Sequence, residues 1–198
     1  MSSLLQGGSG PLDTLSLLAS QIGFTRWAPL SRDALILYPE VRAMCRADRC
    51  RNYGHSWSCP PACGSLNALR ENLSLYSAGI LVQSTARPAD PLDPAALRAA
   101  EDAHKKRFDT LVRQARRLWP DCLPLGSGGC RRCHQCTYPG RPCRHPDKLY
   151  PSMEAAGLWV SDVCSRSGLG YFYGSGTITY TAAVLLKENH LQRNEDAL

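Results

Sequence analysis

Hydrophobic and polar positions along the chain, together with capping and stop residues, predict four helices, and the helical spacing is clearest in the helix that Asp93 and Pro94 begin. Apolar residues return every three or four positions, which puts them on one face of a helix. Capping residues mark the ends, because Ser or Asp begins a helix and Gly or Pro follows its last turn. The predicted helices are residues 12–22 with Gly23 as the stop, a helix from Ser65 to about Tyr76 followed by Gly79, a helix that Asp93 and Pro94 begin and Pro120 ends, and a helix from Ser152 to about Ser165 with Gly168 as the stop.

Three short apolar runs have the composition of strands. They lie at residues 34–38, 80–85 and 177–186. Because strands and helices alternate along the chain, we expect an α/β or α+β fold in a single domain over residues 1–198, with a small mixed sheet flanked by helices. The Ser/Gly-rich residues 1–11 are expected to form a flexible tail.

The composition is that of a globular protein apart from its cysteines. Of 198 residues, 43% are hydrophobic and 20% are charged, which argues against a disordered chain. Ten cysteines are unusual for this length. No run approaches the roughly 18 apolar residues of a transmembrane helix, and the N-terminus lacks the basic and apolar regions of a secretory signal. We therefore expect a cytoplasmic protein without a membrane span, whose reduced cysteines bind metal rather than pair as disulfides.

The sharper cysteine pattern lies in the second cysteine segment, residues 126–148. Cys130, Cys133 and Cys136 follow C-x2-C-x2-C spacing, and Cys143 comes after six further residues. This spacing wraps a short loop around one compact body, which suits a [4Fe–4S] cluster, whereas a zinc site usually takes two C-x2-C knuckles from separate loops. Residues 130–134 also match the C-x-x-C-H pattern of c-type haem attachment, which the missing export signal disfavours. Iron–sulfur is preferred here, and zinc is the alternative.

The first cysteine segment, residues 45–64, is spaced less regularly. It contains Cys45, Cys50, Cys59 and Cys63, and two prolines directly after Cys59 fix the backbone there. Either all four close a second cluster, or Cys45, Cys50 and Cys59 bind three corners and leave one iron open, or the two segments exchange ligands. The sequence is therefore compatible with one or two [4Fe–4S] clusters.

A few other residues carry weaker signals. Glu154 and His55 are weak candidates for catalytic proton transfer, although a favourable acid at a helix start and packing around the site are simpler interpretations. Cys122 and Cys164 are expected to be small buried hydrophobic residues. The Gly-Ser-Gly-Gly stretch at residues 126–129 is interpreted either as a flexible turn or as a source of backbone N–H donors to cluster sulfurs.

Positive charge surrounds both cysteine segments. The formal net charge is +6, and nineteen of the 23 basic residues are arginines. Four thiolates on a cluster or a zinc ion leave roughly −2 per site, so two filled sites would bring the chain to about +2. We therefore expect the arginines to offset anionic metal sites, and we do not expect a nucleic-acid partner. The arginines near the segments are Arg42, Arg46, Arg49, Arg51, Arg131, Arg132, Arg141 and Arg144.

Several stretches, taken in order along the chain, are similar to a known family. The chain resembles an uncharacterised bacterial and archaeal family of predicted metal-binding proteins, a domain of unknown function with C-x4-C…C-P-P and C-x2-C-x2-C…C motifs. The similar stretches are residues 41–65, 79–84, 126–148, 151–163 and 177–186. The resemblance implies metal binding through Cys45, Cys50, Cys59, Cys130, Cys133, Cys136 and Cys143. It also implies that Cys63 is a less fixed position, which favours an open iron at the first segment, and that the role is cytosolic and either anaerobic or redox-linked.

Three functions are compatible with these residues. The first is electron transfer or other redox chemistry through [4Fe–4S] clusters, together with a redox partner protein. The second is an enzyme whose three-cysteine cluster binds a small-molecule substrate at an open iron. The third is an interaction module that zinc stabilises. The sequence leaves open whether the chain is an enzyme.

Overall fold

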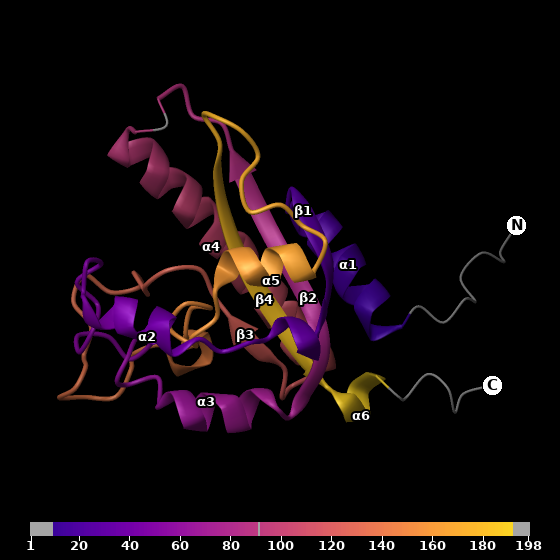
Figure 1. Cartoon of the computed structure of the whole chain (residues 1–198), viewed down its shortest axis with the longest axis horizontal. Coiled ribbons are helices and arrows are strands. Elements are labelled where there is room, and N and C mark those ends of the chain that lie inside the picture. The colour runs from indigo at the N-terminus through magenta and orange to yellow at the C-terminus, as the bar shows by residue number, and fades with distance from the viewer. Residues whose placement is uncertain (1–9, 91, 192–198) are drawn as a thin grey trace, which may run out of the picture.

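The centre of the structure, a computed structural model that describes residues 10–90 and 92–191, is a four-stranded sheet. The strand order is β1-β2-β4-β3, and helices lie on both sides of the sheet (Figure 1). The expected α/β class is confirmed, but all pairings between these strands are antiparallel, so the sheet is not mixed. The strands are β1 (Arg26–Ser31), β2 (Tyr76–Ala86), β3 (Leu123–Leu125) and β4 (Ile178–Lys187).

Helices and two short 3-10 turns connect these strands. They are α1 (Pro11–Ile22), η1 (Arg32–Ala34), α2 (Pro39–Arg46), α3 (Leu66–Leu73), α4 (Pro94–Leu118), η2 (Pro146–Lys148), α5 (Val160–Arg166) and α6 (Glu188–Leu191). Several ends follow the capping residues of the sequence. The Asp93 carboxylate accepts the backbone N–H groups of Ala95 and Ala96 at the start of α4. Ser65 caps α3 in the same way, and Gly23 ends α1 with a φ of 87°.

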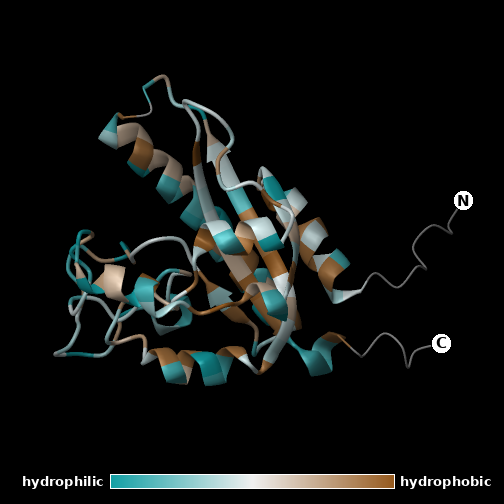
Figure 2. Ribbon diagram, viewed as in Figure 1, coloured by the Kyte–Doolittle hydropathy of each residue, from teal (hydrophilic) through white to brown (hydrophobic). Residues whose placement is uncertain are grey.

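Both faces of the sheet are buried. Side chains alternate along β2, so Ile80 and Val82 pack beneath α1 and α4, whereas Leu81 faces a second core that contains Met153 and Leu158. Figure 2 shows the central strands largely in white and brown, and the cysteine segments hold much of the teal. Burial of each large apolar side chain stabilises the fold by about 1.5–3 kcal/mol. The sheet is therefore a rigid base for the polar loops beside it.

The strand predicted at residues 34–38 is wrong. Arg32–Ala34 form a 3-10 turn, Leu37 makes only an isolated bridge with Leu158, and α2 begins at Pro39. Proline has no N–H to give to a sheet, but it fits the first turn of a helix, where that N–H would have no partner. The apolar side chains of this stretch therefore enter the core from a loop.

The helix predicted from Ser65 ends earlier than expected. α3 stops at Leu73, and Tyr76 already opens β2. Gly79, expected as a helix stop, lies inside β2, where an added Cβ would come within 2.2 Å of the Val184 carbonyl oxygen on β4. Glycine therefore permits the close approach of the two central strands.

The helix predicted from Ser152 is shorter and begins later. The Ser152 hydroxyl accepts the Ala155 N–H at 3.1 Å, as an N-cap would. The chain then turns at Gly157, whose φ is 94°, and α5 covers only Val160–Arg166. Residues 152–158 are thus a turn rather than part of the helix. Most of their side chains are apolar because the turn is buried, and this apolar pattern resembles that of a helix.

Residues 1–9 and 192–198 lie outside the described residues, and most of the predicted tail over residues 1–11 falls there. Its last residue, Pro11, begins α1. Within the described residues, no helix combines the length and apolar character needed to cross a membrane.

Candidate metal centre

The two cysteine segments lie against each other beside the β3 edge of the sheet, although about 60 residues separate them in the sequence. They form the purple and salmon loops beside α2 in Figure 1. The Trp57 ring meets the Tyr138 ring edge-on with centroids 4.9 Å apart, and the Trp57 indole donates to the Arg141 carbonyl at 3.1 Å. At Gly129, an added Cβ would come within 2.6 Å of the Asn52 amide nitrogen. Both segments therefore belong to one lobe.

The first thiol group, Cys45, Cys50, Cys59 and Cys63, gathers around the end of α2. The Cys45 thiol donates to the Glu154 carbonyl at 3.8 Å, and the Cys63 thiol donates to the next carbonyl, that of Ala155, at 3.7 Å. Negative charge on Cys50 or Cys63 would raise the pKa of both Cys45 and Cys59. The four thiols are thus close enough to interact.

Burial dominates the ionisation of the first thiol group. It raises the pKa of Cys45 and of Cys63, and it raises the pKa of Cys59 to about 11. These thiols therefore carry protons at neutral pH when no metal is bound, and a metal has to displace those protons.

Arg42 is the cation at the first thiol group. Its guanidinium donates to the Cys63 sulfur at 3.6 Å and to the carbonyls of Ala155 and Gly64 at 2.6 and 2.8 Å. Its charge lowers the pKa of Cys45 and Cys63, although less than burial raises it. Arg42 therefore favours thiolate at this group.

The backbone on either side of Cys50 is held in an unusual conformation. Asp48 and Arg51 have φ values of 51° and 56°, in the left-handed region that costs non-glycine residues free energy. The Asp48 carboxylate accepts the Tyr53 N–H at 2.8 Å, which helps to hold the turn. This turn brings the exposed Cys50 back toward the other thiols.

The second thiol group, Cys130, Cys133, Cys136 and Cys143, lines a single cavity of about 240 Å³. The first cysteine segment supplies the opposite wall, which includes His55, Ser56 and Trp57. His55 therefore lines the cavity of the second thiol group, although in the sequence it stands between cysteines of the first.

Hydrogen-bond donors point at the sulfurs of the second thiol group. The His145 backbone N–H donates to the Cys143 sulfur at 3.4 Å. Burial raises the pKa of Cys136, but the backbone N–H groups of Tyr138, Trp57 and Thr137 and the Ser56 hydroxyl lower it by more. The thiolate of Cys136 is therefore stabilised before any metal binds, the reverse of the first thiol group.

Two buried serines, Ser56 and Ser58, connect the thiol groups. Each is 3% exposed, and their hydroxyl oxygens lie 3.1 Å apart. The Ser58 hydroxyl is 3.8 Å from the Cys59 sulfur, and the Ser56 hydroxyl lowers the pKa of both Cys59 and Cys136. This pair, which we call the serine bridge, has no distinctive sequence signal beyond its place just before Cys59.

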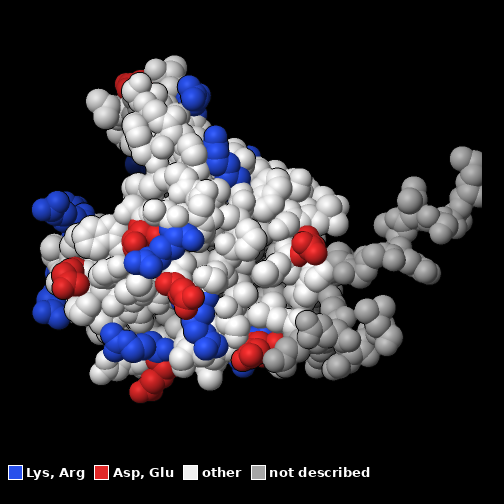
Figure 3. All heavy atoms as spheres, turned by 45° about the vertical axis from the view of Figure 1, so that its right-hand side comes forward, with Lys and Arg blue, Asp and Glu red and all other residues white. Residues whose placement is uncertain are grey.

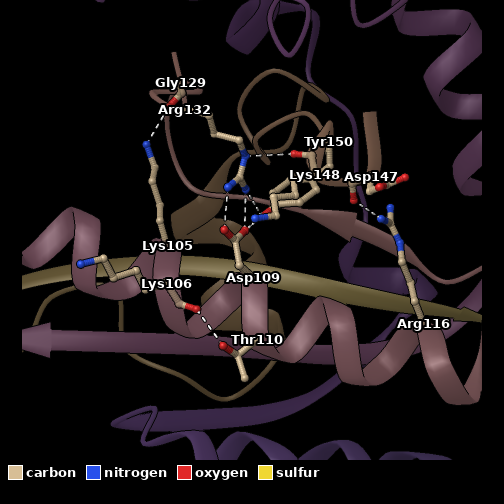
Figure 4. A network of polar contacts seen from close by, with 10 residues as sticks. All are labelled: Lys105, Lys106, Asp109, Thr110, Arg116, Gly129, Arg132, Asp147, Lys148 and Tyr150. Carbon is tan, nitrogen blue, oxygen red and sulfur yellow. Dashed lines mark hydrogen bonds and ion pairs between the residues drawn. The ribbon is translucent and has the colours of Figure 1, made fainter. Parts of the chain in front are cut away.

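Ion pairs with α4 anchor the second cysteine segment (Figure 4). Arg132 makes a two-pronged contact with Asp109 at 2.6 and 2.5 Å, and Asp109 also accepts the Tyr150 hydroxyl. Arg131 pairs with Glu101 at 3.3 Å. The expectation that arginines offset the metal sites thus has a limit, because Arg131 and Arg132 share their charge with carboxylates. On the face drawn in Figure 3, cationic and anionic residues are likewise interspersed.

Glu154 lies beside the first thiol group, where its carboxylate raises the pKa of Cys45. One of its oxygens, Oε2, is buried without a hydrogen-bond partner among the described residues. Cys122 and Cys164 are 5% and 0% exposed within the two cores, as expected. Glu154, a weak candidate from the sequence, thus lies near Cys45.

The donor chemistry of both groups fits a metal that prefers sulfur. Within residues 10–90 and 92–191, no three His, Cys, Asp or Glu side chains are close enough together to hold one metal ion. Each group nevertheless offers four thiols, the donor set of iron–sulfur clusters and of structural zinc. The second group also lines a cavity, so the donor types fit such a metal, although the described side chains do not converge on one ion.

Comparison with known proteins found one family. A family model described as "Predicted metal-binding protein (DUF2284)" matches residues 28–186, a range that includes every cysteine of the chain. No curated protein matches the chain. No solved structure matches it either.

Proposed function

The chain belongs to the DUF2284 family of predicted metal-binding proteins, and we propose that each of its two thiol groups holds one [4Fe–4S] cluster that serves electron transfer in the cytoplasm. Metal binding is what the family supports; the kind of metal, its use and the compartment are the proposal. When bound, such clusters supply one-electron redox chemistry.

The cavity of the second thiol group carries the proposal. Four thiols at C-x2-C-x2-C…C spacing surround about 240 Å³, and no carboxylate or carbonyl-rich ligand set accompanies them. A hard cation would need oxygen ligands. N–H donors to Cys136 and Cys143 are the contacts that stabilise the thiolates of a cluster and raise its potential.

The first thiol group supports a second cluster of its own. Its members influence one another's pKa, and the Cys63 and Cys45 contacts with consecutive carbonyls hold them together. We therefore assign all four ligands to this segment, without exchange between segments. Arg42 would offset part of the negative charge.

The serine bridge supports electron transfer between the two centres. It spans from the Cys59 sulfur to the neighbourhood of Cys136 through two buried hydroxyls. Cys50 and Cys130 are exposed, one in each group, so each centre would have an edge near solvent. A redox partner protein docking at this lobe could then exchange electrons with either centre.

An enzyme with an open iron at the first thiol group is the second candidate. The observation in its favour is the buried, unpartnered Glu154 Oε2 beside Cys45, a group that could handle a proton or bind the metal. In that case Cys63, which already contacts Arg42, would not be a ligand.

The deciding experiment is purification without oxygen, followed by an absorption spectrum and counts of iron, sulfide and zinc per chain. We expect a brown protein with about eight irons and eight sulfides. A colourless protein with stoichiometric zinc would refute both redox candidates. Spectral change on adding a small thiol or carboxylate would favour the open iron over simple electron transfer.

A further inference from the structure

A second cavity lies against the outer side of the second thiol group. This cavity, here the α4 cavity, has a volume of about 200 Å³ and is walled by α4, the 126–132 stretch, Lys148 and Tyr150. Cys130 lines both this cavity and that of the second thiol group. A molecule bound here would therefore sit next to a predicted metal ligand.

The walls of the α4 cavity are held in place by paired charges. Lys105 bridges Glu101 and the Gly129 carbonyl, each at 2.6 Å. Arg132 is fixed on Asp109, as Figure 4 shows. Because these groups satisfy one another, they shape the cavity without needing a ligand.

Cations outnumber anions around this space. Five cationic side chains line it, against the lining carboxylates of Asp102 and Asp109 and the carboxylate of Glu101, which pairs with Lys105 and Arg131. The cations are Lys105, Lys106, Arg131, Arg132 and Lys148. Lys106 and Lys148 are exposed at the surface. An anion entering the cavity would therefore gain electrostatic free energy.

The α4 cavity also has an apolar wall. Phe108 and Tyr150 meet edge-on with ring centroids 5.4 Å apart, and both line the cavity. An inorganic anion would leave these rings without a partner, whereas an organic anion would cover them. The volume is below that of pockets for drug-sized ligands, so the ligand is small.

His104 is the observation that points independently to a ligand. It lines the cavity, is 0% exposed, and its Nδ1 lies 2.9 Å from the Ser84 hydroxyl. Its other nitrogen, Nε2, is buried without a hydrogen-bond partner among the described residues. Burial, together with the charges of Arg107 and Lys105, lowers the pKa of His104 to about 3, so the ring is neutral. Buried polar atoms of this kind are rarely left unpaired.

We propose that the α4 cavity binds a small organic carboxylate with an apolar body, next to Cys130. The cationic rim attracts the carboxylate, the two aromatic rings cover the body, and a polar substituent on the body would pair with the Nε2 of His104 at the inner wall. Binding does not depend on which metal the thiols hold, so the inference stands apart from the proposed function.

The test is calorimetry on the full chain, purified without oxygen with its metal, using benzoate as the probe. Benzamide, which has the same shape without charge, and inorganic phosphate are the matched comparisons. We expect saturable benzoate binding at least about tenfold tighter than either comparison, since a charge-assisted contact and the rings are both needed. Equal affinity for benzamide, or binding of phosphate alone, would overturn the assignment.

Two variants locate the site. Lys106→Gln changes an exposed cation of the cavity, and Arg113→Gln changes an exposed cation of α4 outside its lining. We expect the first to weaken benzoate binding by roughly three- to tenfold and the second to leave it unchanged. The Nε2 resonance of His104 should shift with benzoate in nitrogen NMR. Equal effects of both variants, or an unmoved His104 signal, would place the ligand elsewhere.

Discussion

Each of the two thiol groups offers four sulfurs, but the surroundings of the two groups differ. In the first group, burial raises the pKa of Cys45, Cys59 and Cys63, whereas Cys50 is exposed. The second lies on a loop, where N–H donors lower the pKa of Cys136. Arg42 serves the first group directly, whereas the second depends on ion pairs between its own arginines and α4.

This difference shows two ways of preparing a site for a metal. The first group is held by packed surroundings. Because burial keeps its thiols protonated, a metal must displace those protons when it binds. In the second group, hydrogen-bond donors stabilise the Cys136 thiolate, and ion pairs with α4 hold the loop in place. We therefore expect the first centre to be the more sensitive to acid, and the second the more sensitive to loss of distant charges.

The largest effect is expected from removing one ligand in each group. Cys59→Ser and Cys133→Ser should each lose roughly half of the iron, because the groups are separate. Iron and sulfide counts on each purified variant make the measurement. Cys122→Ala, a buried cysteine outside both groups, should keep all of its metal while losing about 1 kcal/mol of stability. Loss of all iron from either ligand variant would mean one shared centre.

Acid should separate the two groups next. A thiol with a raised pKa takes up a proton at a higher pH, so the first group should release metal before the second as the pH falls from about 8 to about 5. The ion pair between Asp109 and Arg132 should persist through this range, because hydrogen bonds from Arg132 and Tyr150 keep the pKa of Asp109 below its usual value in spite of burial.

Stepwise loss of cluster absorbance on acidification is the readout. The Cys133→Ser variant, which keeps only the first centre, should show the early step alone. A single step in the wild type, or an early step in Cys59→Ser, would contradict the expectation that the first group releases its metal before the second.

Loss of the ion pair between Asp109 of α4 and Arg132 should weaken metal binding at the second group only. Asp109→Asn leaves Arg132 without its carboxylate, and we expect about 10- to 100-fold weaker metal retention at the second centre. Competition with a chelator measures this. Asp162→Asn, which weakens the Asp162–Arg166 pair and the contact of Asp162 with the Tyr38 hydroxyl, is the matched control and should leave metal retention unchanged.

Arg42 should tune only the first group. Arg42→Gln removes a cation from beside Cys63, which disfavours the more negative reduced state. One of two midpoint potentials should therefore fall, by about 60 mV for each tenfold change in the redox equilibrium. Arg42→Lys keeps the charge and should fall less. Equal shifts in both potentials would contradict the separation of the groups.

The serine bridge should give the smallest effect and the one shared by both groups. Ser56→Ala removes the hydroxyl that lowers the pKa of Cys59 and Cys136. Both potentials should move, each by less than the roughly 60 mV of a tenfold change. Ser161→Ala, outside both groups, is the control. A shift at one centre alone would remove Ser56 as a connection.

Local signals in the sequence predicted the parts of this fold that local physics decides. Asp93, Ser65 and Gly23 begin or end helices where expected, and the runs at 80–85 and 177–186 lie in β2 and β4. Gly79 was misleading because its role, the close approach of β2 to β4, depends on a strand about 100 residues away. Tertiary contacts of this kind leave no local pattern.

The candidate site likewise has features that the sequence predicts and features that only the tertiary structure reveals. Cysteine spacing pointed to both thiol groups, but not to their contact through Trp57 and Tyr138, which lie in different segments. From the sequence, His55 is expected to pack within the first cysteine segment, whereas in the structure it lines the cavity of the second group. The arginine surplus was visible, but its pairing with Asp109 and Glu101 depends on where α4 lies.

Two neighbouring but separate centres would be visible in the electron paramagnetic resonance spectrum of the reduced protein. We predict a broadened spectrum from two interacting clusters in the wild type and a simple, narrower signal in both Cys59→Ser and Cys133→Ser. A wild-type spectrum that already shows one isolated cluster, or no signal from a protein that contains zinc, would contradict the account.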